Sequence, residues 1–96
     1  MATVVLINPF EVPEGKDAEF LAGWEAAKEY MERQKGYVST RLHRSVDPKA
    51  RFRFINVAEW ESPQDFIAAL NNPEFVTIRN AVPFPHYPSV YEVIRT

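Results

Sequence analysis

The sequence predicts a single α+β domain with the element order β-α-β-β-α-β, which is the ferredoxin-like arrangement. Runs of β-branched and aromatic residues predict strands at residues 3–8, 37–44, 52–60 and 90–95. Apolar residues at helical spacing predict helices between the first two strands and after the third. This order gives a four-stranded antiparallel sheet with both helices on one face. No linker or repeat interrupts the pattern, so residues 1–96 are expected to form one domain.

The first strand and the first helix have clear expected ends. Thr3 to Asn8 is a β-branched run that Pro9 is expected to stop, because proline donates no backbone hydrogen bond. A turn at residues 13–15 leads into a long amphipathic helix, which Gly36 is expected to end. The apolar face of this helix carries Phe20, Leu21, Trp24, Ala27 and Met31.

A hairpin follows, with arms at residues 37–44 and 52–60 and a turn at 47–49. Alternation in the first arm predicts that Val38, Thr40 and Leu42 share one side of the sheet. The second arm is apolar on both faces, so it needs cover on both sides. The helices cover one face only, and the first strand is apolar on the open face too. We therefore expect a second copy to pack there, sheet against sheet, in a two-fold homodimer that forms a dimeric α/β barrel.

The C-terminal third begins with a helix signal. Ser62 followed by Pro63 predicts a helix start, because serine caps the helix and proline suits its first position. Phe66, Ile67 and Leu70 are expected to face inward. Residues 71–73 break this helix, and a short helical piece is expected at 74–80. Three prolines then predict an extended loop before the last strand at 90–95.

Composition excludes several classes of partner and site. The net charge of −2, with 11 basic residues spread among 13 acidic ones, argues against a nucleic-acid partner. The chain has no cysteine, which excludes a disulfide or thiol nucleophile and fits a reducing compartment. The N-terminal apolar run is too short for a signal or membrane span, so we expect a cytoplasmic protein without a membrane partner. His43 and His86 are too far apart to indicate a metal site.

Three features, in this order along the chain, resemble the antibiotic biosynthesis monooxygenase family of dimeric α/β barrels. They are Asn8 at the end of the first strand, the junction at residues 59–62, and the final strand around residues 91–93. The resemblance covers nearly the whole chain. The family also contains haem-degrading monooxygenases of the IsdG type. The resemblance implies oxidation of polycyclic phenols or quinols without flavin or metal, or the opening of a bound haem, in a cavity between sheet and helices.

The resemblance assigns candidate catalytic roles to three residues. Asn8 is expected to hold a phenolate or peroxide oxygen, and Trp60 to offer an indole N–H and a stacking wall. His86, in an aromatic and proline-rich loop, is a candidate acid or base above the mouth of the cavity. Each has a structural alternative: Asn8 bonds local backbone before Pro9, Trp60 belongs to the core, and His86 lies in solvent or packs against its neighbours.

Aromatic residues are abundant, with two Trp, four Tyr and seven Phe, and some are expected to line the cavity around a flat hydrophobic ligand. The candidate substrate-binding residues are Phe20, Trp24, Phe66, Phe75 and Arg79. The aromatic members are at core spacing as well, and an exposed helix arginine is common, so a purely structural role is the alternative for all five.

The haem branch of the family makes a demand that the sequence does not meet. There, a histidine on the helix after the tryptophan ligates the iron, whereas residues 62–80 contain no histidine. We therefore expect a small cofactor-independent monooxygenase that uses dioxygen on an aromatic polyketide-like or quinol substrate. The alternatives are a non-catalytic dimeric barrel that binds a hydrophobic ligand, and a haem-binding relative that lacks the usual histidine.

Overall fold

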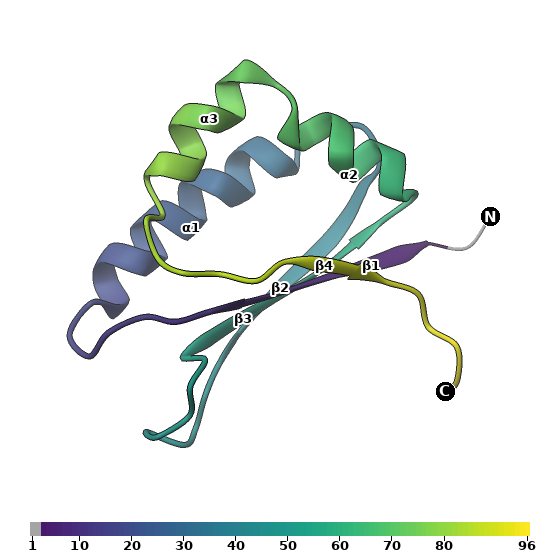
Figure 1. Cartoon of the computed structure of the whole chain (residues 1–96). Coiled ribbons are helices and arrows are strands. Elements are labelled where there is room, and N and C mark those ends of the chain that lie inside the picture. Colours follow the sequence, from purple (N-terminus) through teal and green to yellow (C-terminus); the bar gives the residue numbers. More distant parts are fainter. Residues whose placement is uncertain (1–2) are drawn as a thin grey trace.

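The computed structural model describes residues 3–96, which form one antiparallel sheet with the strand order β2-β3-β1-β4. Helices cover one face of the sheet and leave the other face bare (Figure 1). The order and pairing confirm the predicted ferredoxin-like α+β fold. The elements are β1 (Val4–Phe10), α1 (Asp17–Met31), β2 (Tyr37–Arg44), β3 (Phe54–Trp60), α2 (Pro63–Leu70), α3 (Pro73–Asn80) and β4 (Ser89–Tyr91). No helix within residues 3–96 is long and apolar enough to cross a membrane.

Both C-terminal helices begin with a capping side chain and a proline; α2 starts as predicted, whereas α3 starts at Pro73, one residue earlier than expected. The Ser62 hydroxyl accepts a hydrogen bond from the backbone N–H of Asp65 at 3.1 Å, and Pro63 occupies the first turn of α2. The side chain of Asn72 caps α3 in the same way, at 2.9 Å from the N–H of Glu74. The Ser62 cap fixes where the chain leaves β3, and the Asn72 cap fixes where α3 begins after α2.

β1 continues through Pro9, so the prediction that Pro9 ends this strand is wrong. The Pro9 carbonyl accepts a hydrogen bond from the Tyr87 N–H at 3.1 Å, so the polar groups of Pro9 face the β4 side of the strand. β4 itself pairs only with Val5, Leu6 and Ile7. The missing N–H of Pro9 therefore costs no bond to β3, and the ladder between β1 and β3 extends to Phe10.

Other boundaries also differ from the predicted ones. α1 ends at Met31, because the N–H groups of Arg33 and Gln34 bond the carbonyls three residues earlier and tighten the chain into turns before Gly36. β3 begins at Phe54, two residues later than expected. β4 spans Ser89–Tyr91 and ends where Tyr91 pairs with Val5, so it covers only the start of the strand predicted at residues 90–95.

A bulge at Val38 changes which residues of β2 share a face. The pairing of β2 with β3 shifts between Tyr37 and Ser39. Tyr37 and Thr40 consequently point to the same side as the helices, whereas Val38 is 45% exposed. The predicted alternation that grouped Val38 with Thr40 is therefore wrong, although it holds from Thr40 onward.

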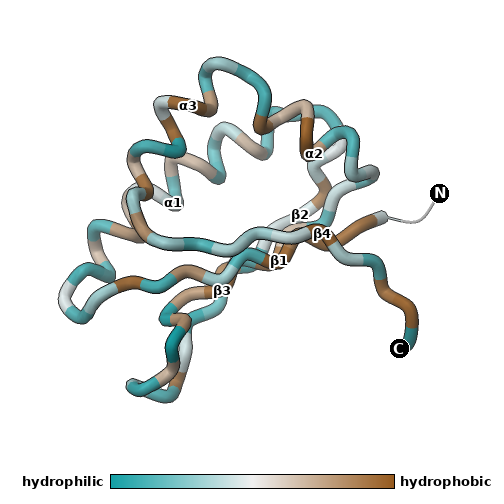
Figure 2. The backbone as a smooth tube through the Cα atoms, in the orientation of Figure 1, coloured by the Kyte–Doolittle hydropathy of each residue, from teal (hydrophilic) through white to brown (hydrophobic). Residues whose placement is uncertain are grey.

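The uncovered face of the sheet is apolar along β1 and β3, as predicted, whereas β2 places Ser39, Arg41 and His43 there. Leu6 and Ala58 point toward the helices, so their neighbours Val5, Ile7 and Val57 point away from them. Apolar colour runs along β1 and β3 and reappears in the C-terminal segment, which leaves the sheet (Figure 2). Among residues 3–96 no helix covers this face (Figure 1).

Candidate functional site

A cavity of about 290 Å³ lies between the helices and the covered face of the sheet. Its walls are mostly apolar side chains from β1, β3 and all three helices. Polar groups enter from the floor and the rim, where the lining includes Asn8, Lys28, Thr40, Asn56, Arg79 and His86. A concave, mainly apolar site with a few converging polar groups is typical of small-molecule sites.

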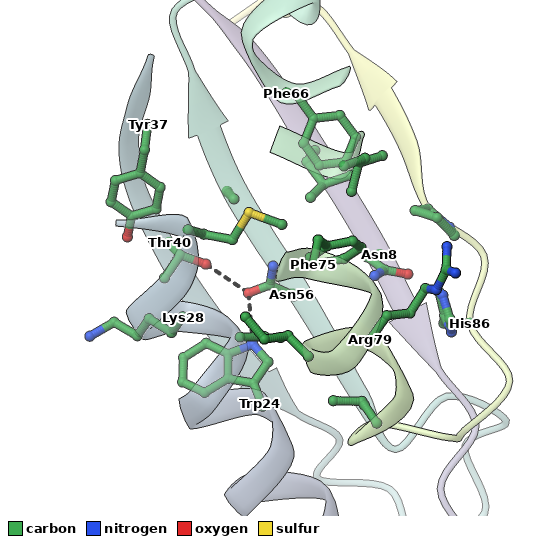
Figure 3. A pocket seen from close by; sticks show the side chains of 18 of the residues that line it. Asn8, Trp24, Lys28, Tyr37, Thr40, Asn56, Phe66, Phe75, Arg79 and His86 are labelled. Atoms are coloured by element: carbon green, nitrogen blue, oxygen red, sulfur yellow. Dashed lines mark hydrogen bonds between the residues drawn. The ribbon is translucent and has the colours of Figure 1, made fainter. Parts of the chain in front are cut away.

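Asn56 lies on the floor of the cavity with its amide held on one side only. Its Oδ1 accepts hydrogen bonds from the Thr40 hydroxyl at 2.7 Å and from the Trp24 indole N–H at 3.3 Å (Figure 3). An indole N–H can only donate, so the oxygen of the amide must be the atom that faces Trp24. The Nδ2 group points away from both partners and has no hydrogen-bond acceptor among residues 3–96. Asn56 therefore presents a preorganised N–H donor to the cavity.

Sequence analysis did not select Asn56, although a signal was available. It is the one amide in the otherwise apolar centre of β3, a position where a polar side chain is costly unless it is bonded. Its two partners come from elements distant in sequence, α1 and β2. The bulge at Val38 that orients Thr40 is not visible in the sequence pattern.

Asn8 is directly opposite Asn56 in the pairing of β1 with β3. Side chains at such opposed positions have Cβ atoms about 5 Å apart, so the two amides are neighbours on the floor of the cavity. Oδ1 of Asn8 is enclosed and has no hydrogen-bond partner within the described residues, including the backbone before Pro9. An unpartnered buried oxygen costs about 1–3 kcal/mol, so this amide is held in the fold at a cost in stability.

Trp60 is 1% exposed and forms part of the cavity wall. Its ring meets Phe66 at a centroid distance of 5.5 Å and Tyr37 at 5.8 Å, both edge to face. Burial raises the pKa of Tyr37, so this phenol on the cavity wall stays neutral near pH 7. The Trp60 indole N–H is enclosed beneath the wall and has no acceptor among residues 3–96. Trp60 thus belongs to both the core and the cavity.

His86 is half-buried at the rim, in the segment between α3 and β4. Its ring packs on Phe10 at a centroid distance of 5.4 Å, and a backbone bridge joins the same two residues. Nδ1 lies 2.9 Å from the carbonyl oxygen of Phe84, which can only accept, so Nδ1 carries the proton of the neutral ring. Nε2 is then left with a free lone pair that can take a proton.

Four of the five predicted substrate-binding residues line this cavity, namely Trp24, Phe66, Phe75 and Arg79. Phe20 does not, so its expected place on the wall is corrected. Its ring is fully buried, stacks on Phe54 at a centroid distance of 4.5 Å and is not part of the cavity lining. Within residues 3–96, no three His, Asp or Glu side chains come together as a metal site requires.

Solved structures similar to this chain share both its size and its fold. A presumed monooxygenase from Shewanella loihica PV-4 is 42% identical, with a TM-score of 0.83, over 99% of this chain and 97% of the other. SnoaB from Streptomyces nogalater, described as a cofactor-independent oxygenase, has a TM-score of 0.87 at 24% identity over 100% and 97% of the two chains.

A third similar structure is Rv3592 from Mycobacterium tuberculosis, described as a heme-degrading protein. It is 28% identical over 100% of this chain and 97% of the other, with a TM-score of 0.75. No curated protein matches the chain significantly. The family model described as antibiotic biosynthesis monooxygenase matches residues 3–81, which include β1, β3 and all three helices. The chain therefore belongs to the antibiotic biosynthesis monooxygenase family.

Proposed function

We propose that the protein is a cofactor-independent monooxygenase that oxidises an aromatic polyketide-like or quinol substrate with dioxygen in this cavity. One observation carries the proposal. The amide of Asn56 is fixed by Trp24 and Thr40 so that its N–H group faces an apolar cavity. Family membership and the similarity to a presumed monooxygenase at 42% identity support the same reaction class.

The arrangement suits a substrate that must lose a proton before it reacts with dioxygen. Desolvation in an apolar cavity opposes the anion of a phenol, so its oxygen needs donors that are already oriented. The Nδ2 group of Asn56 is such a donor, and the amide of Asn8 lies beside it. Removal of one preorganised donor of this kind costs about 10²-fold or more in rate.

His86 is the proposed base. Because Nδ1 bonds the Phe84 carbonyl, Nε2 is free to accept a proton from the substrate. For an anthrone, loss of that proton gives an electron-rich anion that passes one electron to dioxygen. The resulting radicals combine into a carbon–oxygen bond. Loss of the second hydrogen from the same carbon then breaks the oxygen–oxygen bond, so one methylene and one dioxygen become one ketone and one water.

Two further parts of the proposal concern the assembly and the location. The apolar outer face of β1 and β3 supports a homodimer that packs sheet against sheet. The absence of cysteine fits a reducing compartment, and we propose a cytoplasmic location.

Air oxidation of a hydroxyanthrone by the purified protein, with chelator present and no flavin added, tests the proposal. We expect one dioxygen consumed for each anthraquinone formed, with catalytic turnover above the buffer reaction. A protein that binds the hydroxyanthrone without accelerating its oxidation would contradict catalysis and favour a ligand-binding barrel. Conversion of hemin with a reductant to open-chain products and free iron would instead favour the haem branch, for which helices α2 and α3 offer no histidine.

A further inference from the structure

We propose that the natural ligand of this cavity carries a carboxylate, and that Arg79 binds it at the His86 side of the rim. The inference deepens the proposed function by naming a class of substrate, a hydroxylated aromatic acid. It rests on the proposed function only for the location of the site.

The charges on the cavity wall are all of one sign. The chain has 13 acidic and 11 basic residues and a net charge of −2, yet no Asp or Glu lines the cavity. The lining does contain the cations Lys28 and Arg79 together with the imidazole of His86. An apolar cavity whose only formal charges lie at its solvated rim and are positive favours an anionic ligand over a neutral one.

Arg79 is the lining cation without an anionic partner. Lys28 is paired with Glu32 at 3.7 Å, and its side chain points out of the cavity in Figure 3. The other ion pairs among residues 3–96 involve Arg33, Arg51 and Arg53, and Arg79 forms neither an ion pair nor a hydrogen bond in that part of the chain. Arg79 is an exposed residue at the rim of the cavity, so its guanidinium is available to a ligand.

Figure 3 shows the Arg79 side chain extending from α3 toward Asn8 and His86. A guanidinium binds a carboxylate through two parallel hydrogen bonds, a geometry that an ammonium group cannot provide. The cavity thus has two polar regions: the amide of Asn56 with its partners, and the rim at Arg79 and His86. A ligand with a carboxylate on Arg79 would lay its ring across the apolar wall toward the two amides.

Arg79 also has a structural explanation, which the experiment must separate from binding. It lies in the last turn of α3, where a positive charge stabilises the helix dipole. That role predicts an effect on melting temperature when Arg79 is replaced, but no dependence on the charge of a ligand.

The test compares 2-naphthoate with 2-naphthamide, which have the same ring and shape and differ in charge, by isothermal titration calorimetry at neutral pH. Wild type should bind 2-naphthoate about tenfold more tightly, the scale of one partly solvated charge pair. Arg79→Gln should remove that preference and leave the affinity for 2-naphthamide unchanged. Arg33→Gln, at an exposed arginine outside the cavity, should keep the preference. Arg79→Lys, which keeps the charge at the helix end, should lose only part of it.

Equal affinity of wild type for the two probes would overturn the inference, and so would a preference that survives in Arg79→Gln. The calorimetry needs no turnover, so its outcome is separate from that of the hydroxyanthrone assay. A charge preference without oxidation would contradict only the proposed catalysis, whereas oxidation without a charge preference would contradict only the assignment of Arg79. If Arg79→Gln is unfolded by its melting curve, the wild-type comparison and Arg79→Lys decide the question.

Discussion

Two neighbouring rungs between β1 and β3 on the covered sheet face occupy equivalent positions but differ in what fills them, and we call them the closed end and the open end. At one end, Phe10 opposes Phe54, and both pack against Phe20 in a closed aromatic cluster. One rung along the same face, Asn8 opposes Asn56, and the space above them is the cavity. Replacing one pair of aromatic rings by a pair of short amides converts a filled core into a polar floor. The closed end stabilises the fold, and the open end provides the site.

The largest expected effect concerns the closed end. Phe20→Ala should lower the free energy of unfolding by about 3–5 kcal/mol, because it removes a fully buried ring and leaves a void among aromatic neighbours. Phe75→Ala, at a half-buried ring on the cavity wall, should cost clearly less. Urea denaturation of both variants measures the difference. Equal losses of unfolding free energy in the two variants would contradict the distinction between the closed end and the open end.

The two faces of β3 give a second comparison. Val57→Asp places a charge on the uncovered apolar face, where an unpaired buried charge would cost several kcal/mol in the proposed homodimer. We expect sedimentation velocity to show monomers, or an unfolded chain, where wild type sediments as a dimer. Lys49→Asp, in the exposed turn of the hairpin, is the control and should leave the dimer intact. A wild-type monomer at micromolar concentration would refute the proposed assembly.

Changes at the open end should affect the reaction and leave the fold nearly unchanged. Asn8→Ala should lower kcat for a hydroxyanthrone by about 10²-fold through loss of one polar group beside the reacting oxygen. Trp24→Phe should lower it by about tenfold, because it frees the Asn56 amide to rotate while Thr40 still holds it. Asn80→Ala, at an exposed amide outside the cavity, is the control. If kcat and the melting temperature are both unchanged in Asn8→Ala and Trp24→Phe, neither residue takes part in the reaction.

Most of the fold was predictable from sequence, because it depends on local signals. Ser62 and Pro63 start α2 through a cap and a fixed backbone angle, and both act within one turn. The misplaced end of β1 has a different cause. Whether Pro9 interrupts a ladder depends on which neighbour its missing N–H would face, and that follows from the short pairing with β4.

The site was only partly predictable, because most of its geometry depends on contacts between residues far apart in sequence. Asn8 and Trp60 stood out at the ends of strands, and the structure brings both to one cavity. The orientation of the Asn56 amide depends on hydrogen bonds from Trp24 and Thr40, which lie 32 and 16 residues away in sequence. Phe20 and Phe66 look alike as apolar helix positions, and only the packing of α1 and α2 on the sheet separates a core ring from a cavity wall.

The smallest expected effect concerns the loop that carries His86. Two hydrogen bonds lower the pKa of the Glu11 carboxyl group. The one from the Tyr87 hydroxyl has the larger effect, and the one from the Arg51 guanidinium comes second. Because the pKa of Glu11 is lower in the folded than in the unfolded state, its ionised form stabilises the folded protein. This stabilisation is present above the unfolded pKa, near 4.3, and is lost as the pH falls through the pKa of the folded state. Glu11→Gln should therefore reduce the loss of melting temperature on acidification. Glu14→Gln, at an exposed acid in the neighbouring turn, is the control. An identical pH dependence in wild type and Glu11→Gln would show that this contact contributes nothing.

The central claim is that the paired amides of Asn8 and Asn56 stabilise a phenolate inside an apolar cavity. The pKa of a bound hydroxyanthraquinone, followed by its absorbance during a pH titration, tests this most directly. We predict that wild type lowers the pKa of the bound phenol by about one unit or more relative to the free dye, and that Asn56→Ala reverses the shift, since a buried phenol without donors is harder to ionise. A bound pKa at or above the free value in wild type, unchanged in Asn56→Ala, would contradict the account.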